Sequence, residues 1–237
     1  MACSWTKSQA PVFVVLDIHG KVIEVLLTPV YIDCSAETDA SRDMIAREDV
    51  FKEKFLADLL KFMKEHKPDV TILEAHYLSP NLKENISWIK SDPGPLNVIY
   101  VDESLSNLNA EDWGISMSAL ILNMPGLIIL NALRRAVVLG RYLQNPLVTV
   151  ATLCGSKRGV LSWDICPHQE FLTPEEKYSV IEQVMLDVTN QVGVDINLAI
   201  KHKRSFAPLR FISGLGVRKA KVLQQSLESA GIPHSLL

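Results

Sequence analysis

The chain has few cysteines, and they form neither a metal-binding nor a disulfide pattern. Four occur among 237 residues, at positions 3, 34, 154 and 166, and no two are spaced as a CxxC pair. Paired cysteines at short spacing are typical of zinc sites and of small disulfide-rich secreted domains. The sequence therefore predicts a protein of a reducing compartment, with neither a zinc site nor a disulfide framework.

Long hydrophobic runs are also missing. The apolar run at residues 12–16 is short and ends at Asp17, so it does not have the form of a signal peptide. The longest apolar stretch, residues 115–130, contains Asn123 and is broken by Pro125 and Gly126. Because a membrane span needs about 20 continuous apolar residues, we expect neither secretion nor a membrane-spanning helix.

No charge of one sign dominates the chain. It carries 24 Lys and Arg against 27 Asp and Glu, which gives a net charge of −3 and a pI near 6.1. The whole-chain charge does not predict a nucleic-acid-binding protein, so any such surface must be local. Hydrophobic residues make up 48% and charged residues 22%, which is typical of folded globular proteins with a buried core.

The first part of the chain alternates strand patterns with helix patterns. Apolar runs predict strands at residues 12–16, 22–27, 70–73 and 97–101. Apolar side chains at three- and four-residue spacing predict a helix at residues 50–63, and further helices are predicted at residues 81–90 and 127–143, with a loop at residues 93–95. Pro68 stops the first helix and Pro146 follows the last. Such alternation indicates an α/β sheet.

From a predicted domain boundary near Gly155, only helices are expected after a short irregular segment. Thr173 at the N-cap, Pro174 at the first helical position and Glu176 two residues later form a capping box. An apolar stripe follows along the same helix, which ends at Gly193. The stripe consists of Val180, Val184, Val188 and Val192.

The most specific motif, at residues 208–223, resembles a helix-hairpin-helix. Gly214 and Gly216 permit backbone angles that a side chain would forbid, as a tight turn between two helices requires. Leu215 is expected to point between the helices, and Ala220 to let them pack closely. The second helix starts just after Gly216, so its unpaired N–H groups can bind a phosphate oxygen.

Basic side chains gather around this hairpin. Seven occur between residues 201 and 221, with no acidic residue among them: Lys201, Lys203, Arg204, Arg210, Arg218, Lys219 and Lys221. We predict a sequence-independent contact with the backbone of DNA or RNA. The predicted contact residues are Ser213, Gly214, Gly216, Arg218, Lys219 and Lys221. The alternative is that the turn only joins two packed helices and that the basic side chains are ordinary solvated surface.

Four stretches of the chain together resemble one known family. They are LGRYLQNPL at residues 139–147, FLTPEEK at 171–177, VGVDIN at 192–197 and ISGLG at 212–216. Their order and spacing resemble the suppressor of Ty six family of eukaryotic transcription elongation factors and histone chaperones, which has the bacterial relative Tex. The resemblance covers nearly the whole chain.

The resemblance implies a fold and a division into domains. We expect an α/β RNase H-like domain of the YqgF type at residues 1–154, with a mixed sheet flanked by helices, followed by an all-α helix-hairpin-helix domain at residues 155–237. Full family members also have an acidic N-terminal tail, a helix-turn-helix region and S1 and tandem SH2 modules, which have no counterpart here. The first strand is expected to be clipped. We interpret the chain as a fragment or a short paralogue.

The same resemblance predicts that the chain is not a nuclease. RNase H-like nucleases hold two divalent metals with carboxylates from the first strand, a middle strand and a late helix. Ser4 stands where the first-strand aspartate is expected. The late helix offers Arg134, Arg135 and Arg141, whose positive charges repel a metal pair. We therefore predict no catalytic residue and no metal site.

Four carboxylates remain near the predicted strand ends: Asp17, Glu74, Asp102 and Glu103. In an alternative function, Glu74 and Asp102 would join a third carboxylate in a metal-dependent nuclease or resolvase of the RuvC type. Otherwise these side chains solvate strand ends and cap a helix. No serine or cysteine has the context of a covalent catalyst, and no glycine motif for nucleotides occurs.

We therefore expect a non-catalytic scaffold within a nuclear transcription elongation and chromatin factor. The resemblance implies the RNA polymerase II elongation complex and histones as partners, and the hairpin adds a weak contact with DNA or RNA. No cofactor, small-molecule substrate or membrane is expected. A further interpretation is that the fragment does little on its own because partner-binding modules are missing.

Overall fold

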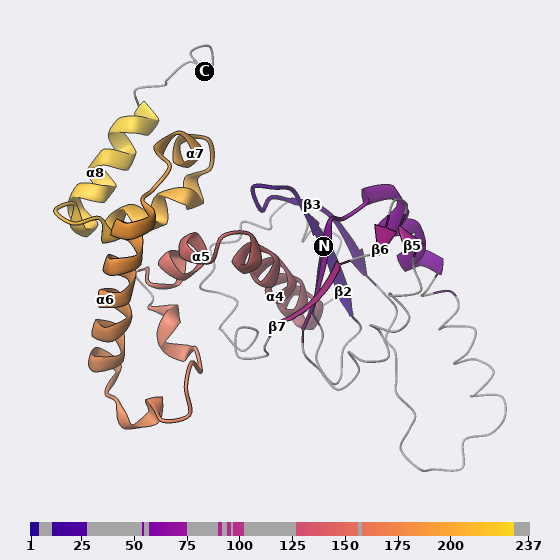
Figure 1. The fold of residues 1–237 in the computed structure, drawn as a ribbon, viewed down its shortest axis with the longest axis horizontal. Coiled ribbons are helices and arrows are strands. Elements are labelled where there is room, and N and C mark those ends of the chain that lie inside the picture. Colours follow the sequence, from indigo (N-terminus) through magenta and orange to yellow (C-terminus); the bar gives the residue numbers. More distant parts are fainter. Residues whose placement is uncertain are drawn as a thin grey trace. The chain divides into compact units, whose positions relative to one another are not determined.

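A computed structural model describes residues 1–4, 11–27, 54, 57–74, 90–91, 94–95, 97–101, 127–155 and 158–229. These residues form two compact units (Figure 1). The first contains the described residues up to 101 together with residues 127–140, and the second contains the described residues from Arg141 onward. The predicted domain boundary between residues 154 and 155 stays a prediction.

A mixed five-stranded sheet forms the first unit. Its strands are β1 (Ala2–Ser4), β2 (Val12–Leu16), β3 (Val22–Leu27), β4 (Val70–Glu74) and β7 (Asn97–Val101). They lie in the order β3-β2-β1-β4-β7, with β2 antiparallel to β1 and β3, and β4 parallel to β1 and β7. The four strands predicted from apolar runs are confirmed, and β1 lies at the centre of the sheet.

Helices cover both faces of this sheet because neighbouring residues of a strand point to opposite faces. One face packs against helical residues 57–66, and the other packs against α4 (Leu127–Gln144). The first core consists of Cys3, Phe13, Val15, Leu59, Phe62, Met63 and Leu73. The second consists of Val12, Val14, Ala132, Leu133, Ala136 and Val137. The mixed sheet flanked by helices is therefore confirmed.

The helix that covers the first face ends as predicted, just before Pro68. Lys67 adopts a left-handed backbone conformation with a φ of 43°, and its N–H donates to Met63 O at 2.8 Å. A left-handed residue of this kind commonly ends a helix and satisfies one of its last carbonyl groups. Proline cannot continue the helix beyond this point.

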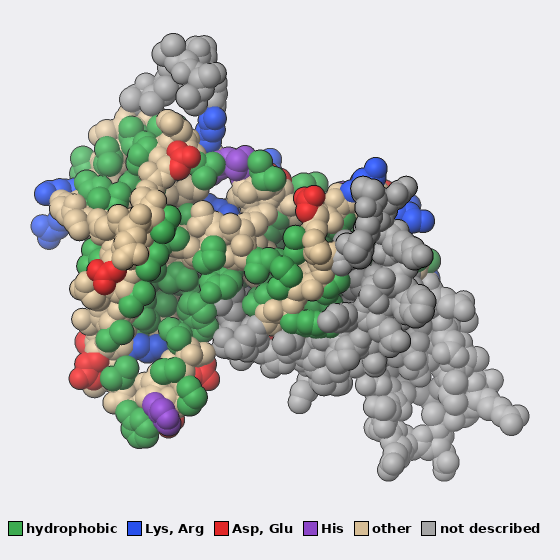
Figure 2. Space-filling view, in the orientation of Figure 1, with side chains coloured by type: hydrophobic (Ala, Val, Ile, Leu, Met, Phe, Trp, Pro, Cys, Tyr) green, Lys and Arg blue, Asp and Glu red, His purple; other side chains and the backbone are tan. Residues whose placement is uncertain are grey.

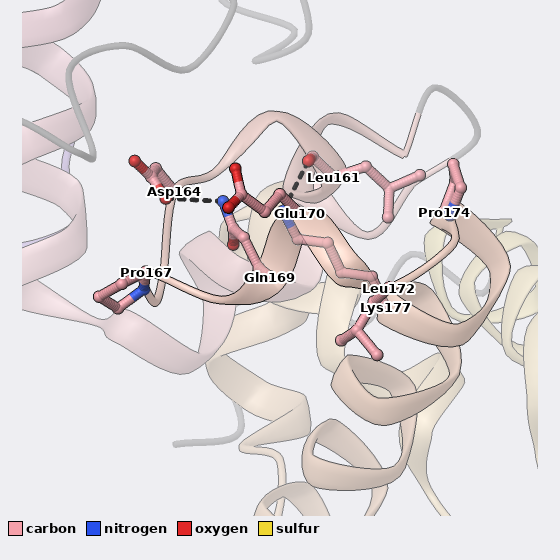
Figure 3. A pocket seen from close by; sticks show the side chains of 8 residues that line it. All are labelled: Leu161, Asp164, Pro167, Gln169, Glu170, Leu172, Pro174 and Lys177. Atoms are coloured by element: carbon pink, nitrogen blue, oxygen red, sulfur yellow. Dashed lines mark hydrogen bonds between the residues drawn. The ribbon is translucent and has the colours of Figure 1, made fainter.

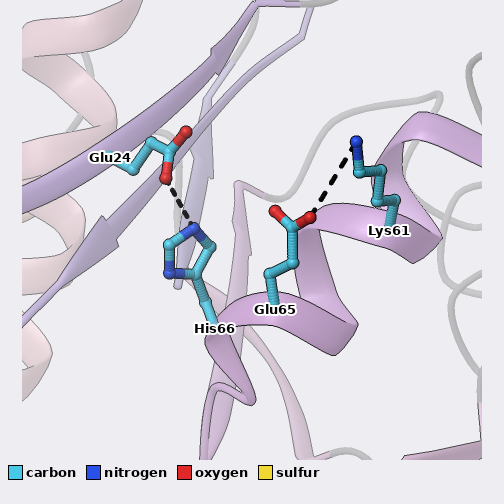
Figure 4. Close-up of polar contacts among 4 residues, drawn as sticks. All are labelled: Glu24, Lys61, Glu65 and His66. Atoms are coloured by element: carbon cyan, nitrogen blue, oxygen red, sulfur yellow. Dashed lines mark hydrogen bonds and ion pairs between the residues drawn. The ribbon is translucent and has the colours of Figure 1, made fainter.

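A polar contact joins the same helix to the sheet (Figure 4). His66 Nε2 lies 2.9 Å from the Glu24 carboxylate of the edge strand β3. Figure 4 also shows Lys61 and Glu65, whose charged atoms are 3.9 Å apart on the exposed side of the helix. Exposed pairs within one helix contribute little to stability, and of the two contacts only the one from His66 to Glu24 joins the helix to the sheet.

Helices and 3-10 helices make up the second unit as far as the structure describes it. They are α5 (Pro146–Leu153), η3 (Gly159–Ser162), η4 (Gln169–Phe171), α6 (Pro174–Val192), α7 (Ile196–Lys201), η5 (Lys203–Phe211) and α8 (Gly216–Ser229). The hydrophobic centre brings together α7, η5 and α8 through Ala199, Phe206, Leu209 and Ala220. An all-helical second part was predicted and is confirmed.

The predicted capping box is present at the start of α6. The Thr173 hydroxyl accepts from Glu176 N at 3.3 Å, and the Glu176 carboxylate accepts from Thr173 N at 2.9 Å. The Glu176 carboxylate also accepts from the Thr173 hydroxyl at 2.8 Å, and the two hydrogen bonds that Thr173 donates to the carboxylate lower the pKa of Glu176. The box satisfies N–H groups that the first turn of a helix leaves without partners.

The apolar stripe of α6 faces solvent. The buried residues of this helix are Tyr178, Met185 and Thr189. The stripe residues Val180, Val184, Val188 and Val192 are 57%, 53%, 37% and 71% exposed. The stripe is therefore a surface feature of the helix and not part of its core.

Some predictions concern residues that the structure does not describe. These are the first residues of the predicted helix 50–63, the predicted helix 81–90 up to residue 89, and Asp102 and Glu103. Lys90 itself lies in β5 (Lys90–Ser91), which pairs antiparallel with β6 (Gly94–Pro95). The predictions of a helix reaching Lys90 and of a loop at Gly94 and Pro95 are therefore wrong. These residues form two short antiparallel strands.

No helix in the described ranges combines the length and the hydrophobicity needed to cross a membrane.

Candidate nucleic-acid interface

The hairpin predicted from the glycine pair lies between η5 and α8 (Figure 1). Gly214 and Gly216 have φ values of 84° and 61°, in the left-handed region that favours glycine. A Cβ atom at either position would meet no atom within 4 Å, so the backbone angle and not a lack of space calls for glycine. Leu215 packs into the hydrophobic centre with Ala220, as predicted.

The element that enters the hairpin is a 3-10 helix. Pro208 lies inside η5, and proline lacks the N–H that an α-helix would need at this position. Ile212 then leaves the element with extended backbone, and Leu215 N donates to Ile212 O at 3.0 Å, which closes the turn. The motif therefore consists here of a 3-10 helix, a hairpin and an α-helix.

Asn190, on α6, holds the hairpin in place. Its side-chain nitrogen donates to Phe211 O at 3.1 Å, and its Oδ1 accepts from Ser213 N at 3.0 Å. The backbone N–H of Ser213 is thus used within the fold, whereas the residue as a whole is exposed. Sequence reasoning missed Asn190; the available signal was an asparagine, a weak helix former, near the end of a predicted helix.

The basic residues around the hairpin do not share one surface, because Arg210 is used internally. Its Nη1 donates to Cys154 O at 2.7 Å and its Nη2 to the Tyr178 hydroxyl at 3.1 Å. Tyr178 also donates to Cys154 O, at 2.9 Å. The Arg158 guanidinium lies 4.4 Å from the centre of the Tyr178 ring. Arg210 therefore anchors the end of α5 and is not a phosphate ligand.

The basic residues of α8 are exposed near its first turn. Arg218, Lys219 and Lys221 all lie on the surface, and Figure 2 shows Lys and Arg side chains projecting where α8 begins. Lys219 Nζ also donates to Gly214 O at 2.9 Å, so it supports the hairpin as well as adding charge. Lys203, in contrast, pairs with Glu228 at 3.6 Å.

The N-terminal turn of α8 has the electrostatic character of an anion site. It contains no acidic residue, and the first N–H groups of any α-helix lack carbonyl partners within the helix. The positive end of the helix dipole adds to the charge of Arg218 and Lys221. This arrangement can hold a phosphate oxygen without reading the sequence of bases.

Ser4 and Glu74 lie side by side at the centre of the sheet, at the strand ends where the alternative function places a metal site. Ser4 Oγ donates to Glu74 Oε2 at 2.7 Å, and both residues are buried. Burial and the nearby Glu74 carboxylate raise the pKa of the Cys3 thiol. Within the described residues, no three His, Cys, Asp or Glu side chains are grouped to hold a metal ion.

Comparison with known proteins identifies relatives of both parts of the chain. A family model described as "Helix-hairpin-helix motif" matches residues 158–234. "Transcription elongation factor SPT6 homolog" and "Transcription elongation factor SPT6-like", both of Arabidopsis thaliana, are 44% and 42% identical over 98% of the chain. "Transcription elongation factor SPT6" of Drosophila melanogaster is 28% identical over 76% of it. The chain spans 14%, 18% and 10% of these three relatives.

Proposed function

Because the chain is related by sequence, along nearly its whole length, to one segment of the SPT6 family of transcription elongation factors, we propose that it is a non-catalytic module of transcription elongation. The resemblance inferred from four sequence stretches is confirmed by these relatives. The chain spans less than a fifth of them, so the partners of the whole proteins enter only as proposals. We place RNA polymerase II and histones among those partners, and the protein in the nucleus.

For the first unit we propose an RNase H-like fold without the carboxylates that hold the catalytic metal ions in RNase H-like nucleases. The order of its strands supports this: three antiparallel strands, β1 to β3, are followed by two parallel ones on the other side of β1. The Ser4 hydroxyl beside Glu74 supports the loss of chemistry, because a serine leaves one carboxylate fewer for a divalent metal. The unit then acts through its shape and its surface.

For the second unit we propose a weak, sequence-independent contact with DNA or RNA through the hairpin. The observation that carries this proposal is the hairpin itself, with Gly214 and Gly216 at positive φ directly before the acid-free first turn of α8. The contact residues are Ser213, Gly214, Gly216, Arg218, Lys219 and Lys221. A single site of this kind typically binds non-specifically, with a Kd of about 10⁻⁴ to 10⁻⁶ M at physiological salt.

The test removes the charge of the hairpin while leaving its glycines in place. Arg218→Gln, Lys219→Gln and Lys221→Gln are combined, and binding to labelled duplex DNA and to RNA of several sequences is measured by fluorescence anisotropy over a range of salt concentrations. We expect weaker binding for every sequence, and a slope of log K against log salt whose magnitude is smaller by about two to three.

A matched control removes the same charge elsewhere. Lys54, Lys61 and Lys64 are exposed on the first unit, and replacing all three by glutamine should leave both affinity and slope nearly unchanged. An equal loss of nucleic-acid affinity in the two triple variants would show that only the net charge of the chain matters. Unchanged binding in the hairpin variant would leave the hairpin as a mere connection between helices.

A further inference from the structure

The exposed valine stripe of α6 is a surface that the hairpin does not use. Val180, Val184 and Val188 are 57%, 53% and 37% exposed, and their four-residue spacing places them next to one another along the helix. Scattered apolar side chains are normal on a protein surface, but a contiguous row marks an interaction site more often. The stripe is therefore a candidate interaction site.

A pocket of about 450 Å³ continues the stripe at the start of α6 (Figure 3). It is lined by Leu161, Asp164, Pro167, Gln169, Glu170, Leu172, Pro174 and Lys177. Lys177 lies three residues before Val180, so the two side chains are neighbours on the helix. Pro174 and Lys177 thus line the pocket from the start of α6, one turn before Val180.

The ammonium group of Lys177 is used inside this segment. It donates to Leu161 O and to Trp163 O, both at 2.7 Å, and desolvation lowers its pKa. The two carbonyl groups hold it in place, so it fixes the loop against α6. The remaining charged groups of the pocket are carboxylates.

These carboxylates give the surface an acidic character. Asp164 Oδ1 accepts from Gln169 Nε2 at 2.7 Å, whereas Glu170 has no partner among the described residues. Asp187 is exposed beside the stripe, and Lys177 is the one basic residue in the sequence of α6. Figure 2 shows hydrophobic side chains with acidic ones beside them over this part of the second unit.

Two exposed apolar side chains lie at the pocket: Leu172, which lines it, and the neighbouring Phe171. Phe171 is 79% exposed and Leu172 is 44% exposed. The Phe171 ring stacks on that of His168, with 6.2 Å between the ring centres. Exposed aromatic side chains held in one orientation are typical anchors of protein interfaces.

We propose that the valine stripe and the adjoining pocket bind a basic amphipathic helix of a partner protein. The apolar side of that helix packs on the valines, as helices do in apolar grooves. A Lys or Arg side chain enters the pocket, with its aliphatic part against Leu172 and Pro174 and its charged end near Asp164 and Glu170.

Charge selects this occupant over two others. A second copy of the chain would bring its own acidic rim against the first, and like charges across an interface cost affinity. A nucleic acid would meet carboxylates where it needs cations. The proposal is independent of the hairpin, which lies at the other end of α6 near Asn190.

The test uses the whole chain and two designed helical peptides that share one leucine stripe. One peptide carries arginines beside the stripe and the other carries glutamates. We expect the arginine peptide to bind, and the glutamate peptide to bind at least about tenfold more weakly. Val184→Glu should lower the affinity for the arginine peptide by about tenfold. The double variant Asp164→Asn with Glu170→Gln should bind the two peptides with more nearly equal affinities.

Val222→Glu is the matched control, because Val222 is 61% exposed on α8, away from the stripe. It should leave peptide binding unchanged, and circular dichroism of every variant checks that the fold is kept. Equal binding of the two peptides would overturn the proposal, as would equal effects of the Val184 and Val222 variants. Light scattering that shows a dimer broken by Val184→Glu would identify a second copy as the occupant instead.

Discussion

At the scale of single residues, Ser4 and Glu74 form a buried hydrogen-bonded pair at the centre of the sheet. Ser4 and Glu74 meet at the ends of the parallel strands β1 and β4, 2.7 Å apart. An aspartate in place of Ser4 would bring a second negative charge to a buried carboxylate, which is unfavourable unless a cation or a proton joins them. The serine instead donates a hydrogen bond to Glu74.

Removing this donor should destabilise the first unit. Ser4→Ala leaves the buried Glu74 carboxylate with one hydrogen bond fewer, which costs about 1–3 kcal/mol. Urea unfolding of the variant measures the loss. Glu74→Gln and the double variant complete a mutant cycle; purely additive effects would mean that the Ser4–Glu74 contact contributes nothing of its own.

The three cysteines that the structure describes should react very differently with alkylating agents. Cys166 is exposed, whereas Cys3 and Cys154 are buried. Burial raises the pKa of Cys154 from 9.0 to about 11, and the thiolate is the reactive form. With iodoacetamide near pH 8, peptide mapping should find Cys166 modified first, and Cys3 and Cys154 only after unfolding. Early modification of Cys154 would contradict its burial.

The same shift predicts how stability depends on pH. The folded protein holds the Cys154 proton more tightly than the unfolded chain does, so this contribution is complete below pH 9. It is lost as the pH rises from 9 to about 11, because the unfolded chain gives up the proton first. The free energy of unfolding of the natural chain should therefore fall relative to that of Cys154→Ala as the pH rises from 9 to about 11.

At the scale of secondary structure, α6 organises the second unit. Its start is fixed by the capping box, its middle buries Tyr178 and Met185, and its last turns carry Asn190. Asn190→Ala should lower stability by about 1–2 kcal/mol and speed hydrogen exchange at the Ser213 N–H. Asn190→Asp, which keeps the acceptor for Ser213, and Gln191→Ala, an exposed neighbour, are the controls. Unchanged exchange at Ser213 would contradict the role of Asn190.

The helix also shows what can and cannot be predicted from sequence. Its capping box depends on a few adjacent residues, so the start at Thr173 was predicted correctly. Periodicity identified the apolar row of valines but not the direction it faces, which depends on packing far along the chain. The same holds for the basic cluster: Arg210 belongs to it by sequence, yet its side chain turns inward and donates to Cys154 O.

For the hairpin, local rules were sufficient because glycine at positive φ leaves few alternatives. Gly214, Gly216, Leu215 and Ala220 all have the predicted conformations or contacts. The contribution of Asn190 comes from another helix, 21 residues before Phe211 in the chain. No short pattern encodes such a distant hydrogen bond.

At the scale of the whole molecule, the extent of the second unit can be tested with two fragments. α5 contacts η5 and α6, and Cys154 O accepts from both Tyr178 and Arg210. A fragment that starts at residue 155 lacks these partners, whereas one that starts at residue 141 keeps them. We expect the longer fragment to have the higher Tm in thermal unfolding. Equal Tm values would support the predicted boundary at residues 154 and 155.

The hairpin is braced from two sides, by Asn190 on α6 and by Lys219 reaching back to Gly214 O. A loop fixed in this way during folding has little conformational entropy left to lose when a ligand arrives. If the hairpin binds a phosphate as proposed, the backbone should keep its conformation on binding, and even a low-affinity contact can form and dissociate rapidly.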